Sequence, residues 1–264
     1  MPIKRHQVKS KLTVGYVLQS HPETMKYFPA TELLTKKNFT DMIRKYKKVY
    51  LKPDRGRKSR GIIRVEQEGP SAYLLRSIIK GKQHKFDHFN KLWSEVKELT
   101  AGRRYVVQQE IKSVTNDGRN FDLRCHALRI NGEWVIGGIC ARVGELGNFV
   151  TTSHIGGTPT PLETLFTDLL GYDNEEQSEV LERLNDCILQ AVKVVSPIYP
   201  KNLEFAVDIG LDKEKQVWIY EVNNQPLIRG NFKLLPDKTL YHRIRSLRDE
   251  ARKSNESNLS NNTD

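Results

Sequence analysis

The sequence predicts an α+β fold whose sheets are mostly antiparallel. Strand-like and helix-like segments are interspersed along the 264 residues, and several strands follow one another through short turns. Consecutive strands with short connections pair antiparallel, whereas a parallel sheet needs a crossover, usually a helix, between its strands. The clearest pair is Phe121 to Ile130 and Glu133 to Val143, which flank Asn131-Gly132, the strongest short hairpin signal.

The elements before residue 112 follow from apolar periodicity and from turn residues. In the segment Thr35 to Tyr46, apolar side chains recur at helical spacing, and Thr35 is a suitable N-cap. The run VYLKP, Val49 to Pro53, is typical of a strand, and the glycine- and arginine-rich loop Asp54 to Gly61 follows it. The further elements expected here are a strand at residues 62–66, an amphipathic helix at 86–99 and a strand at 105–111.

The later part of the chain contains two helices, a second hairpin and a tail. Residues 178–195 show an apolar face at helical spacing, and residues 237–253 indicate a charged helix. Between them, Leu203 to Pro226 consists of two apolar, β-rich runs around a polar, charged turn, which predicts a hairpin. The Asn- and Ser-rich segment 254–264 has the composition of a disordered tail.

This second hairpin carries the most informative side chains of the chain, Asp208, Glu221 and Asn223. Because side chains on a strand alternate between faces, Glu221 and Asn223 share one face. A turn made of the two residues Glu214 and Lys215 would define the register of the ladder. Asp208 would then lie directly opposite Glu221, and two facing carboxylates repel each other by about 3 kcal/mol at an effective dielectric constant near 20. A cation, a proton or a basic side chain must therefore lie between them.

Three oxygen ligands on one rigid face suit Mg²⁺, which proteins usually hold by one or two carboxylates together with substrate phosphates. The alternative is a surface hairpin with solvated acids. The apolar neighbours Ile209 and Ile219 favour burial of the hairpin, and buried acids need partners. We therefore predict Asp208, Glu221 and Asn223 as metal ligands.

The composition indicates a globular chain with a basic surface. The hydrophobic content is 38%, and no stretch approaches the roughly 20 apolar residues of a membrane helix. The N-terminal segment lacks the apolar core of a signal peptide, and three cysteines without CxxC spacing indicate reduced thiols in a cytoplasmic protein. The net charge of +11 suits a nucleic acid or a polyphosphate, and basic runs at residues 36–60 and 80–85 are also compatible with a solvated face.

Basic and glycine residues could hold phosphate groups. Lys52 ends the VYLKP strand, where a lysine acts as a point charge for phosphate oxygens, and Gly56 and Gly61 let backbone amides approach those oxygens. The loop is not a Walker A loop, because no G-K-[ST] sequence follows. Arg142 could stabilise charge on a transferred phosphoryl group. The alternatives are a surface lysine and an arginine in an ordinary ion pair.

In their order, these segments resemble the ATP-grasp superfamily from Lys11 to Phe232. The likeness rests on the ordered set VYLKP with its glycine loop, VVQQEI, FDLRC, ARVG, IGG and DIG…EVNNQP, and not on any single member. Within the superfamily, the chain is most similar to the YheC/YheD group, which is named for the endospore coat. It also shares the D-x-R and E-V-N patterns of RimK-type glutamate ligases.

The resemblance implies two α+β lobes that clamp ATP, with Mg²⁺ as the second cofactor. Residues of about 40–110 would form the nucleotide-clamping lobe and residues 111–235 the metal-binding lobe of one domain at 1–253, followed by the tail. Gln109 and Ile111 would read adenine through their backbone groups. The nucleotide-binding residues implied by the resemblance are Lys11, Lys52, Gly56, Gly61, Gln108, Gln109, Glu110, Ile111 and, at the ribose, Asp122. Arg124 and Arg142 would act on the phosphate side as catalytic residues.

The chemistry implied by the resemblance is carboxylate–amine or carboxylate–thiol ligation through an acyl phosphate. Only about 50 residues precede Lys52, so the N-terminal lobe of typical members is expected to be largely missing. The first alternative is an ATP-binding protein of the spore coat without turnover, with coat proteins as partners and spore association. The second is a basic nucleic-acid-binding module, which ranks last because the chain has no recognisable RNA or DNA motif. The histidines carry no assigned role and are expected to be structural.

Overall fold

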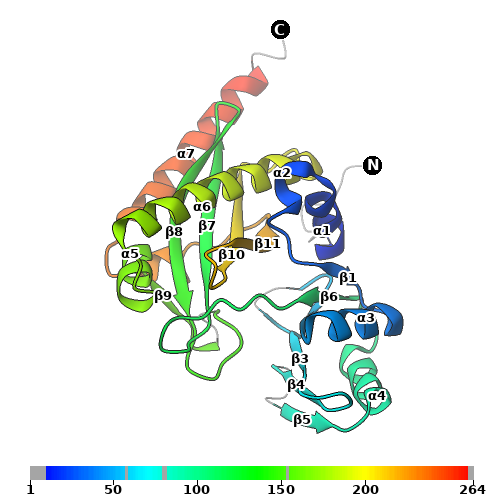
Figure 1. Ribbon diagram of the computed structural model, residues 1–264. Coiled ribbons are helices and arrows are strands. Elements are labelled where there is room, and N and C mark those ends of the chain that lie inside the picture. Colours follow the sequence, from blue (N-terminus) through cyan, green and yellow to red (C-terminus); the bar gives the residue numbers. More distant parts are fainter. Residues whose placement is uncertain (1–9, 57–58, 79–81, 153–154, 261–264) are drawn as a thin grey trace. The chain divides into compact units, whose positions relative to one another are not determined.

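The chain forms two compact units, each built from helices and one antiparallel sheet (Figure 1). The computed structural model describes residues 10–56, 59–78, 82–152 and 155–260. Unit 1 comprises Met1–Tyr16 and Pro29–Ile111, and unit 2 comprises Val17–Phe28 and Lys112–Asp264. Two units with antiparallel sheets and covering helices confirm the predicted α+β class.

Within the described residues, unit 1 has a six-stranded sheet in the order β1-β6-β2-β3-β4-β5, and all neighbours pair antiparallel. Apolar side chains of α3 and α4 form one core with alternate residues of the sheet, such as Leu51 and Val107. The alternation leaves a polar face on the other side of the sheet, which carries Lys52, Arg64 and Gln108. The elements are β1 (Thr31–Leu33), α3 (Lys36–Tyr46), β2 (Lys48–Pro53), β3 (Ile63–Gln67), β4 (Tyr73–Ser77), β5 (Lys82–Phe86), α4 (Phe89–Thr100) and β6 (Tyr105–Gln109).

The structure confirms most of the elements predicted for unit 1 and corrects others. Thr35 caps α3, because its side chain accepts a hydrogen bond of 3.1 Å from the backbone N–H of Asn38. The predicted helix at residues 86–99 begins at Phe89 instead, since Phe86 is the last residue of β5. The sequence did not predict β4 and β5. Neither five-residue strand shows a clear apolar alternation, because β4 (YLLRS) begins with a continuous apolar run and β5 (KQHKF) is mostly polar.

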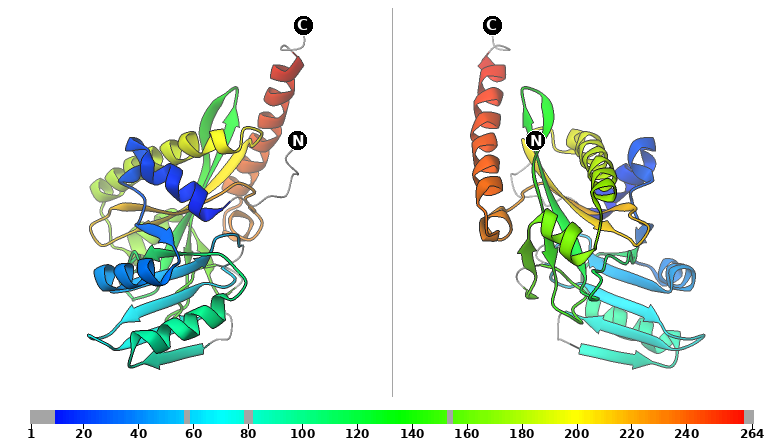
Figure 2. Two further views of the ribbon diagram at one scale, coloured as in Figure 1. Left: turned by 90° about the vertical axis from the view of Figure 1, so that its right-hand side faces the viewer. Right: turned by 60° about the vertical axis from the view of Figure 1, so that its left-hand side comes forward.

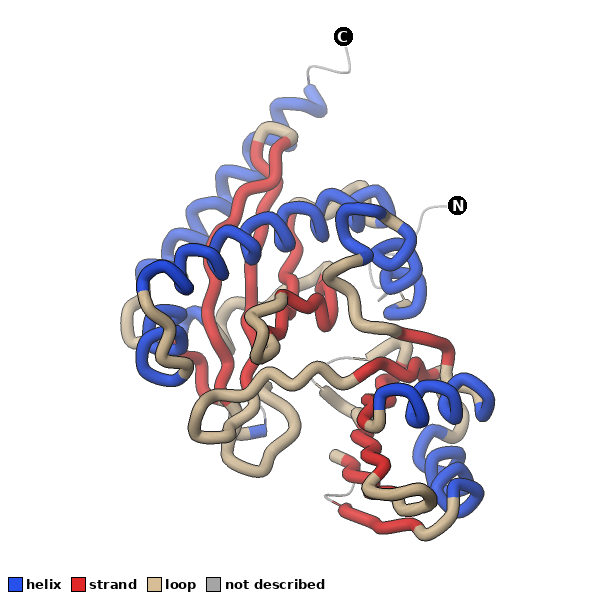
Figure 3. Tube along the Cα trace, in the orientation of Figure 1, coloured by secondary structure: helices blue, strands red, loops and turns tan. Residues whose placement is uncertain are grey.

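In the described part of unit 2, five strands form a sheet in the order β11-β10-β7-β8-β9 (Figure 3). The long helices α6 and α7 lie on opposite sides of this sheet (Figure 2). The predicted Asn131-Gly132 turn is confirmed, with φ of 51° and 89° at its two residues. The elements are β7 (Phe121–Ile130), β8 (Glu133–Val143), β9 (Thr158–Thr160), α5 (Leu162–Thr164), a π-helical turn (Leu165–Leu169), α6 (Asn174–Val195), β10 (Glu204–Leu211), β11 (Val217–Asn223) and α7 (Thr239–Ser260). Short 3₁₀ turns lie at Ser196–Ile198 and Phe232–Leu234, α2 is Pro22–Met25, and the unit boundary falls inside α1 (Lys11–Ser20).

The helix α7 packs directly on the backbone of β8 at two glycines. A Cβ atom at Gly137 would lie 2.7 Å from Cδ1 of Leu128 and 3.2 Å from Cγ1 of Ile244. A Cβ atom at Gly138 would lie 3.3 Å from Cδ2 of Leu240 on α7. Real Cβ atoms rarely approach so closely, so the glycines allow the helix to lie near the strand.

The predicted disorder from residue 254 is wrong for residues 254–260, because α7 continues to Ser260. Within this part of the helix, the hydroxyl of Ser254 accepts a hydrogen bond of 2.8 Å from the backbone N–H of Asn131 and donates one of 2.9 Å to the Asn131 side chain. These bonds attach the helix to the β7–β8 turn, which a reading of composition alone does not reveal. Residues 261–264 lie outside the described residues. Among the helices of the described chain, none combines the length and apolar character of a membrane span.

Candidate functional site

Three charged side chains lie next to one another across the sheet of unit 2. Arg124 on β7 pairs with Asp208 on β10, and Asp208 pairs with Glu221 on β11. Directly opposed residues point to the same face of a sheet, so these three side chains form one row, which we call the charged row. Nε of Arg124 lies 3.1 Å from Oδ1 of Asp208, and both side chains are largely buried. The predicted opposition of Asp208 and Glu221 is therefore confirmed.

Arg142 brings a second guanidinium to the charged row. It lies opposite Asp122 in the β7–β8 ladder, and its Nε and Nη2 donate to the two carboxylate oxygens of Asp122 at 2.7 Å and 2.5 Å. The same Nη2 lies 3.2 Å from Oδ2 of Asp208, so one guanidinium bridges two carboxylates. Burial alone would lower the pKa of Arg142, but the charges of Asp122 and Asp208 outweigh burial and raise it. Arg142 is thus a buried, oriented cation.

One oxygen of Asp208 is buried without a hydrogen bond in the described structure. Its Oδ2 accepts a hydrogen bond of 3.3 Å from the Asn223 side chain. Its Oδ1 and the Nε of Arg124 lie 3.1 Å apart, but they are not aligned as a hydrogen bond, and each remains without one. Buried polar atoms are nearly always hydrogen-bonded, so such an oxygen suggests a partner such as an ion. A cation at Oδ1 fits this arrangement.

The donor set suits a hard cation. Asp208 and Glu221 offer carboxylate oxygens and Asn223 offers an amide oxygen, which are ligands that Mg²⁺ takes. Within the described residues, no group of three or more His, Cys, Asp or Glu side chains is placed to hold a metal ion. The set therefore depends on Asn223 as its third member. Burial lowers the pKa of Arg124, and the charge of Asp208 opposes this effect.

The predicted two-residue turn between β10 and β11 is wrong. Asp212 and Gln216 close the turn, with N of Asp212 donating to O of Gln216 at 3.2 Å, so the turn consists of the residues 213–215. Near the turn, the ladder is therefore one residue away from the predicted register, with Ile209 opposite Ile219. A β-bulge further along the hairpin restores the predicted pairing of the acids.

On the polar face of unit 1, Lys52 and Gln108 lie together. Nζ of Lys52 donates to Oε1 of Gln108 at 2.5 Å, and Nε2 of Gln108 donates to Oγ1 of Thr31 at 2.8 Å. Gln108 is buried, so both ends of its amide are held in one orientation. This arrangement positions the ammonium group of Lys52 on the polar face, where a lysine can meet an anion.

Glu110 is paired with an arginine that the sequence analysis missed. Nε and Nη2 of Arg64 donate to the two carboxylate oxygens of Glu110 at 2.7 Å and 3.0 Å, and Nη1 donates to Glu66 at 3.0 Å. Burial alone would lower the pKa of Arg64, but the hydrogen bonds and charge of Glu110 raise it. Arg64 lies on β3 and Glu110 follows the end of β6, 46 positions later in the chain, so no local pattern could have paired them. A nucleotide contact from Glu110 would therefore come from its backbone.

The backbone of the predicted adenine segment is partly used by the sheet. The N–H of Gln109 donates to O of Ala30 at 2.9 Å, and the N–H of Glu110 donates to O of Lys48 at 3.1 Å. An adenine contact from the backbone of Gln109 would thus use its carbonyl group. Ile111 follows β6 and is the last residue of unit 1.

The glycine loop lies beside the start of α1. Nζ of Lys11 donates to O of Gly56 at 3.4 Å, which brings these two predicted residues together. The buried carboxylate of Asp54 accepts a hydrogen bond of 3.0 Å from a backbone N–H at the start of α1. Gly61 has a φ of +82°, and a Cβ atom there would lie 2.8 Å from its nearest neighbour. The residues 57–58 of this loop lie outside the described ranges.

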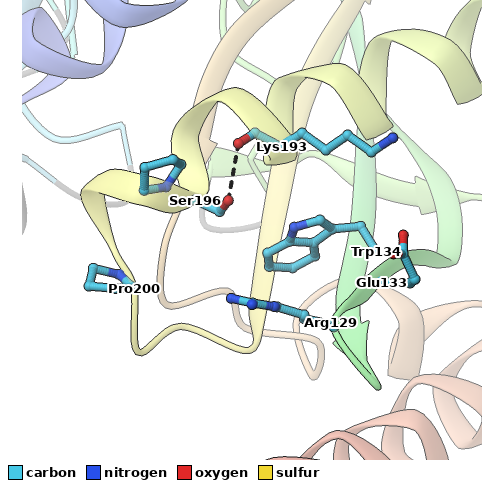
Figure 4. A pocket seen from close by; sticks show the side chains of 8 residues that line it. Arg129, Glu133, Trp134, Lys193, Ser196 and Pro200 are labelled. Carbon is cyan, nitrogen blue, oxygen red and sulfur yellow. Dashed lines mark hydrogen bonds between the residues drawn. The ribbon is translucent and has the colours of Figure 1, made fainter.

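A cavity of about 380 Å³ opens elsewhere in unit 2, beside the tip of the β7–β8 hairpin (Figure 4). Arg129 and Trp134 line it from the hairpin, and Lys193, Ser196 and Pro200 line it from α6 and the turn that follows. None of the predicted site residues is among the described residues that line this cavity. We therefore take the charged row, and not the cavity, as the candidate site of unit 2.

His126 has a structural environment, as the sequence analysis expected. Its Nε2 lies 3.1 Å from Oε2 of Glu204, and Nε of Arg248 on α7 donates to the same oxygen at 2.6 Å. Its Nδ1 is buried and makes no hydrogen bond to the described residues. Burial lowers the pKa of His126, although Glu204 opposes this effect. Burial alone would raise the pKa of Glu204, but hydrogen bonds from His126 and Arg248 lower it.

This triad predicts a loss of stability on acidification. The folded-state pKa of His126 lies below its unfolded value of about 6.5, so the unfolded chain binds the extra proton first and stability falls as the pH drops below about 6.5. Glu204 adds a further loss near and below its unfolded pKa of about 4.3. Urea unfolding at several pH values between 7 and 5 should show this slope, and His126→Gln should reduce it. An unchanged slope in the variant would contradict the assignment.

Comparison with known proteins identifies the family of the chain. A profile of the YheC/D-like ATP-grasp family matches residues 2–248. The endospore coat-associated protein YheD of Bacillus subtilis (strain 168) is 23% identical over 222 residues, which are 82% of this chain and 48% of YheD. The chain thus spans about half the length of this relative.

Two solved structures share the fold. The D-alanine–D-alanine ligase from Bacillus anthracis matches with a TM-score of 0.53 and 14% identity, over 93% of this chain and 66% of that chain. The ATP-grasp ligase PsnB, in complex with a minimal precursor, Mg and ADP, matches with a TM-score of 0.50 and 11% identity, over 92% of this chain and 59% of that chain. At such identities, the likeness shows the fold alone.

Proposed function

Because the chain belongs to the YheC/D-like ATP-grasp family, we propose that it is an ATP- and magnesium-dependent ligase that joins a carboxylate to an amine or a thiol. The charged row carries the proposal, because Asp208 faces Glu221 and keeps a buried oxygen without a hydrogen bond to the described residues. PsnB, which shares the fold, was determined with Mg and ADP. This supports the same type of ligands for this chain.

Asp208, Glu221 and Asn223 are the proposed metal ligands. Mg²⁺ held there would neutralise charge on the nucleotide phosphates and position them for transfer. The Oδ1 of Asp208 supports this role, since it faces Nε of Arg124 at 3.1 Å but accepts no hydrogen bond from the described residues, which leaves its lone pairs for a cation. The opposition of Asp208 and Glu221 supports it too, because the repulsion between two facing carboxylates is relieved by a cation.

Arg124 and Arg142 are the proposed catalytic cations. Each lies within 3.2 Å of an oxygen of Asp208, Arg124 as a member of the charged row and Arg142 beside it. A cation that is already oriented stabilises developing phosphoryl charge without reorganisation. Asp122, which the family resemblance places at the ribose, orients Arg142 through two hydrogen bonds. Its oxygens have further lone pairs with which to accept a ribose hydroxyl.

Unit 1 supplies the other proposed nucleotide-binding groups. Lys52, held by Gln108, would contact phosphate oxygens, and Lys11 would support the glycine loop through Gly56. Gly61 would permit the close turn that ends this loop. Adenine would meet backbone groups of the segment 108–111, in which Gln109 offers its carbonyl and Glu110 is anchored through its side chain by Arg64.

The proposed reaction needs positioning and charge neutralisation more than acid–base groups. A carboxylate oxygen of the first substrate attacks the γ-phosphorus of ATP, the bond to the β–γ bridging oxygen breaks, and ADP leaves. The amine or thiol of the second substrate then attacks the carbonyl carbon of the acyl phosphate and displaces inorganic phosphate. Arg124 and Arg142 would stabilise the charge that moves onto the transferred oxygens.

Binding and turnover test the proposal separately. ATP with Mg²⁺ should raise the melting temperature of the protein more than ATP with EDTA, because a ligand that binds only the folded state stabilises it. Release of ADP and phosphate that depends on an added amino acid or peptide would support a ligase. Binding without such release across a broad panel would support a nucleotide-binding protein without turnover. A melting temperature insensitive to ATP and Mg²⁺ would contradict both functions.

Replacement of Lys52 by alanine tests the phosphate role in unit 1. We expect the dissociation constant for ATP to rise by about tenfold or more, because a hydrogen bond to a charged group is worth ~1.5–3 kcal/mol. Lys37→Ala is the matched control, since Lys37 is exposed and pairs with Asp41 at 2.8 Å on the same helix. Isothermal titration calorimetry with a non-hydrolysable ATP analogue measures both variants. Equal affinities for the two variants would remove Lys52 from the site.

A further inference from the structure

A β-bulge in β11 lies directly beside the charged row. On the turn side of the bulge, Ile209 pairs with Ile219, and on the other side Asp208 pairs with Glu221. Consecutive residues of β10 thus face residues of β11 that are two positions apart, and Tyr220 is the extra residue between them. Such bulges re-aim the side chains that follow them. Here the side chains that follow are the proposed ligands.

Without the bulge, the three-residue turn would give the opposite result. A regular ladder from Ile209 and Ile219 would place Tyr220 opposite Asp208 and Glu221 opposite Val207. A shift of one residue moves a side chain to the other face of the sheet. Val207 is fully buried, so the carboxylate of Glu221 would then enter an apolar layer. The extra residue is what keeps Glu221 on the face of Asp208.

Contacts of the Tyr220 side chain hold this extra residue out of the ladder. The hydroxyl groups of Tyr220 and Ser113 share a hydrogen bond of 2.7 Å, and Ser113 is buried. The ring of Tyr220 reaches Ser113 across Gly210 of β10. A Cβ atom at Gly210 would lie 2.1 Å from Oη of Tyr220 and 2.5 Å from Oγ of Ser113. Only glycine leaves room for this hydrogen bond.

The outer edge of β11 is held beside the same bulge. The backbone N–H of Ile219 donates to O of Tyr27 at 2.7 Å. The hydroxyl of Tyr27 in turn donates to Oδ2 of Asp186 on α6 at 2.7 Å. The residue before Tyr220 is therefore attached to the rest of unit 2 on the side away from β10. The bulge is restrained from both sides of the strand.

We propose that Gly210, Tyr220 and Ser113 are positioning residues for the metal site. They hold the bulge of β11 and thereby place Glu221 and Asn223 on the face that carries Asp208. The inference rests on the proposed function, because the binding of Mg²⁺ by these ligands is itself a proposal. If it holds, Mg²⁺ binding needs more than the presence of Asp208, Glu221 and Asn223. It also needs the β10–β11 register that places these three side chains on one face.

The variant Gly210→Ala tests the inference. The added methyl group displaces the Tyr220 ring, and we expect the dissociation constant for Mg²⁺, titrated in the presence of ADP, to rise by about tenfold or more. The affinity for ADP in EDTA should stay near the wild-type value. Gly69→Ala is the control, because among the described residues a Cβ atom there meets only Ala72, at 3.6 Å. Equal losses of metal-free and metal-dependent binding in Gly210→Ala would indicate general damage and overturn the inference.

A deletion provides the decisive rescue. Removing Tyr220 takes out the extra residue, so the regular ladder from the three-residue turn brings Glu221 opposite Asp208 directly. Deletion of Tyr220 in the Gly210→Ala background should therefore restore the affinity for Mg²⁺, which simple destabilisation of the hairpin does not predict. No recovery in a folded double variant would overturn the inference.

Different results would contradict Mg²⁺ binding at this site and the positioning role of the bulge residues. If the wild-type protein with ADP shows no affinity for Mg²⁺, the proposed metal site fails, whatever the variants do. If the wild type binds Mg²⁺ and Gly210→Ala binds it equally well, only the positioning role is wrong. Circular dichroism and the melting temperature of each variant establish that the comparison is made between folded proteins.

Discussion

Replacing Glu221 by alanine is expected to abolish magnesium-dependent nucleotide binding while the protein remains folded. The variant removes one of the two facing carboxylates of the charged row and leaves Asp208 with its arginine partners. Fold stability should change little, because Glu221 is only partly buried and its removal relieves the repulsion by Asp208. Calorimetric titration of a non-hydrolysable ATP analogue, with Mg²⁺ and with EDTA, separates the two contributions to affinity.

The same hairpin offers a control for this variant. Glu214 lies in the turn between β10 and β11, is exposed, and pairs with Lys213 at 3.2 Å. Glu214→Ala removes an identical carboxylate from the same hairpin but not from the charged row, so magnesium-dependent binding should persist. If Glu221→Ala retains the full difference between Mg²⁺ and EDTA, the metal assignment is wrong.

Replacing Arg142 by alanine is expected to cause the largest loss of stability among single changes at the site. Arg142 is 3% exposed and bridges Asp122 and Asp208, so its removal leaves two buried carboxylates short of a partner. Removal of one partner from a buried ion pair costs about 3–5 kcal/mol. Urea unfolding followed by circular dichroism should show a lower transition midpoint with an unchanged slope.

Two further variants show whether the loss comes from uncompensated charge. Arg119 pairs with Asp117 at 2.7 Å but is one-third exposed, so Arg119→Ala should cost less than about 1 kcal/mol. The double variant Arg142→Ala with Asp122→Ala removes an unpaired acid together with its partner. It should be more stable than Arg142→Ala alone, and a strictly additive double variant would contradict the buried-pair explanation.

The pairing of Asp208 with Glu221 was predicted from the sequence, but for an incomplete reason. The prediction assumed a two-residue turn and a regular ladder. The structure has a three-residue turn and a bulge at Tyr220, whose effects on the register cancel. Apolar alternation defines the face of a strand only up to the next irregularity, and the space left by Gly210 for Tyr220 is a packing property. Local sequence therefore could not supply this detail.

Contacts between distant strands lay beyond local patterns altogether. The sequence identified Asp122, Arg124 and Arg142 on one predicted hairpin, and the Asn131-Gly132 turn defined their register well. It could not show that β10 lies next to β7, which is what brings Arg142 within 3.2 Å of Asp208. Strand order depends on how the whole sheet is packed, and no sequence period encodes it.

In unit 1, the sequence also could not reveal the ion pair between Arg64 and Glu110, which lies in the predicted nucleotide segment 108–111. Arg64 was included only in the predicted strand at residues 62–66 and was given no role, yet it anchors Glu110 through two hydrogen bonds. The run VYLKP was predicted as a strand, and the structure shows that its alternation buries Val49 and Leu51 and turns Lys52 to the other face. The sequence thus predicted the strand, whereas the partners on each face came only with the structure.

The packing of α7 on the two adjacent glycines of β8 can be tested by random mutagenesis. A Cβ atom at Gly137 would lie 3.2 Å from Ile244, and a Cβ atom at Gly138 would lie 3.3 Å from Leu240 and from Phe232. In a library that randomises both codons, selection for well-folded clones should enrich glycine strongly. Clones that accept alanine at position 138 should arise mainly together with a shorter side chain at position 240 or 232, since a Cβ atom at Gly138 would lie 3.3 Å from both residues. Sequencing the selected clones would identify the residues in contact between α7 and β8 without any assay of catalysis.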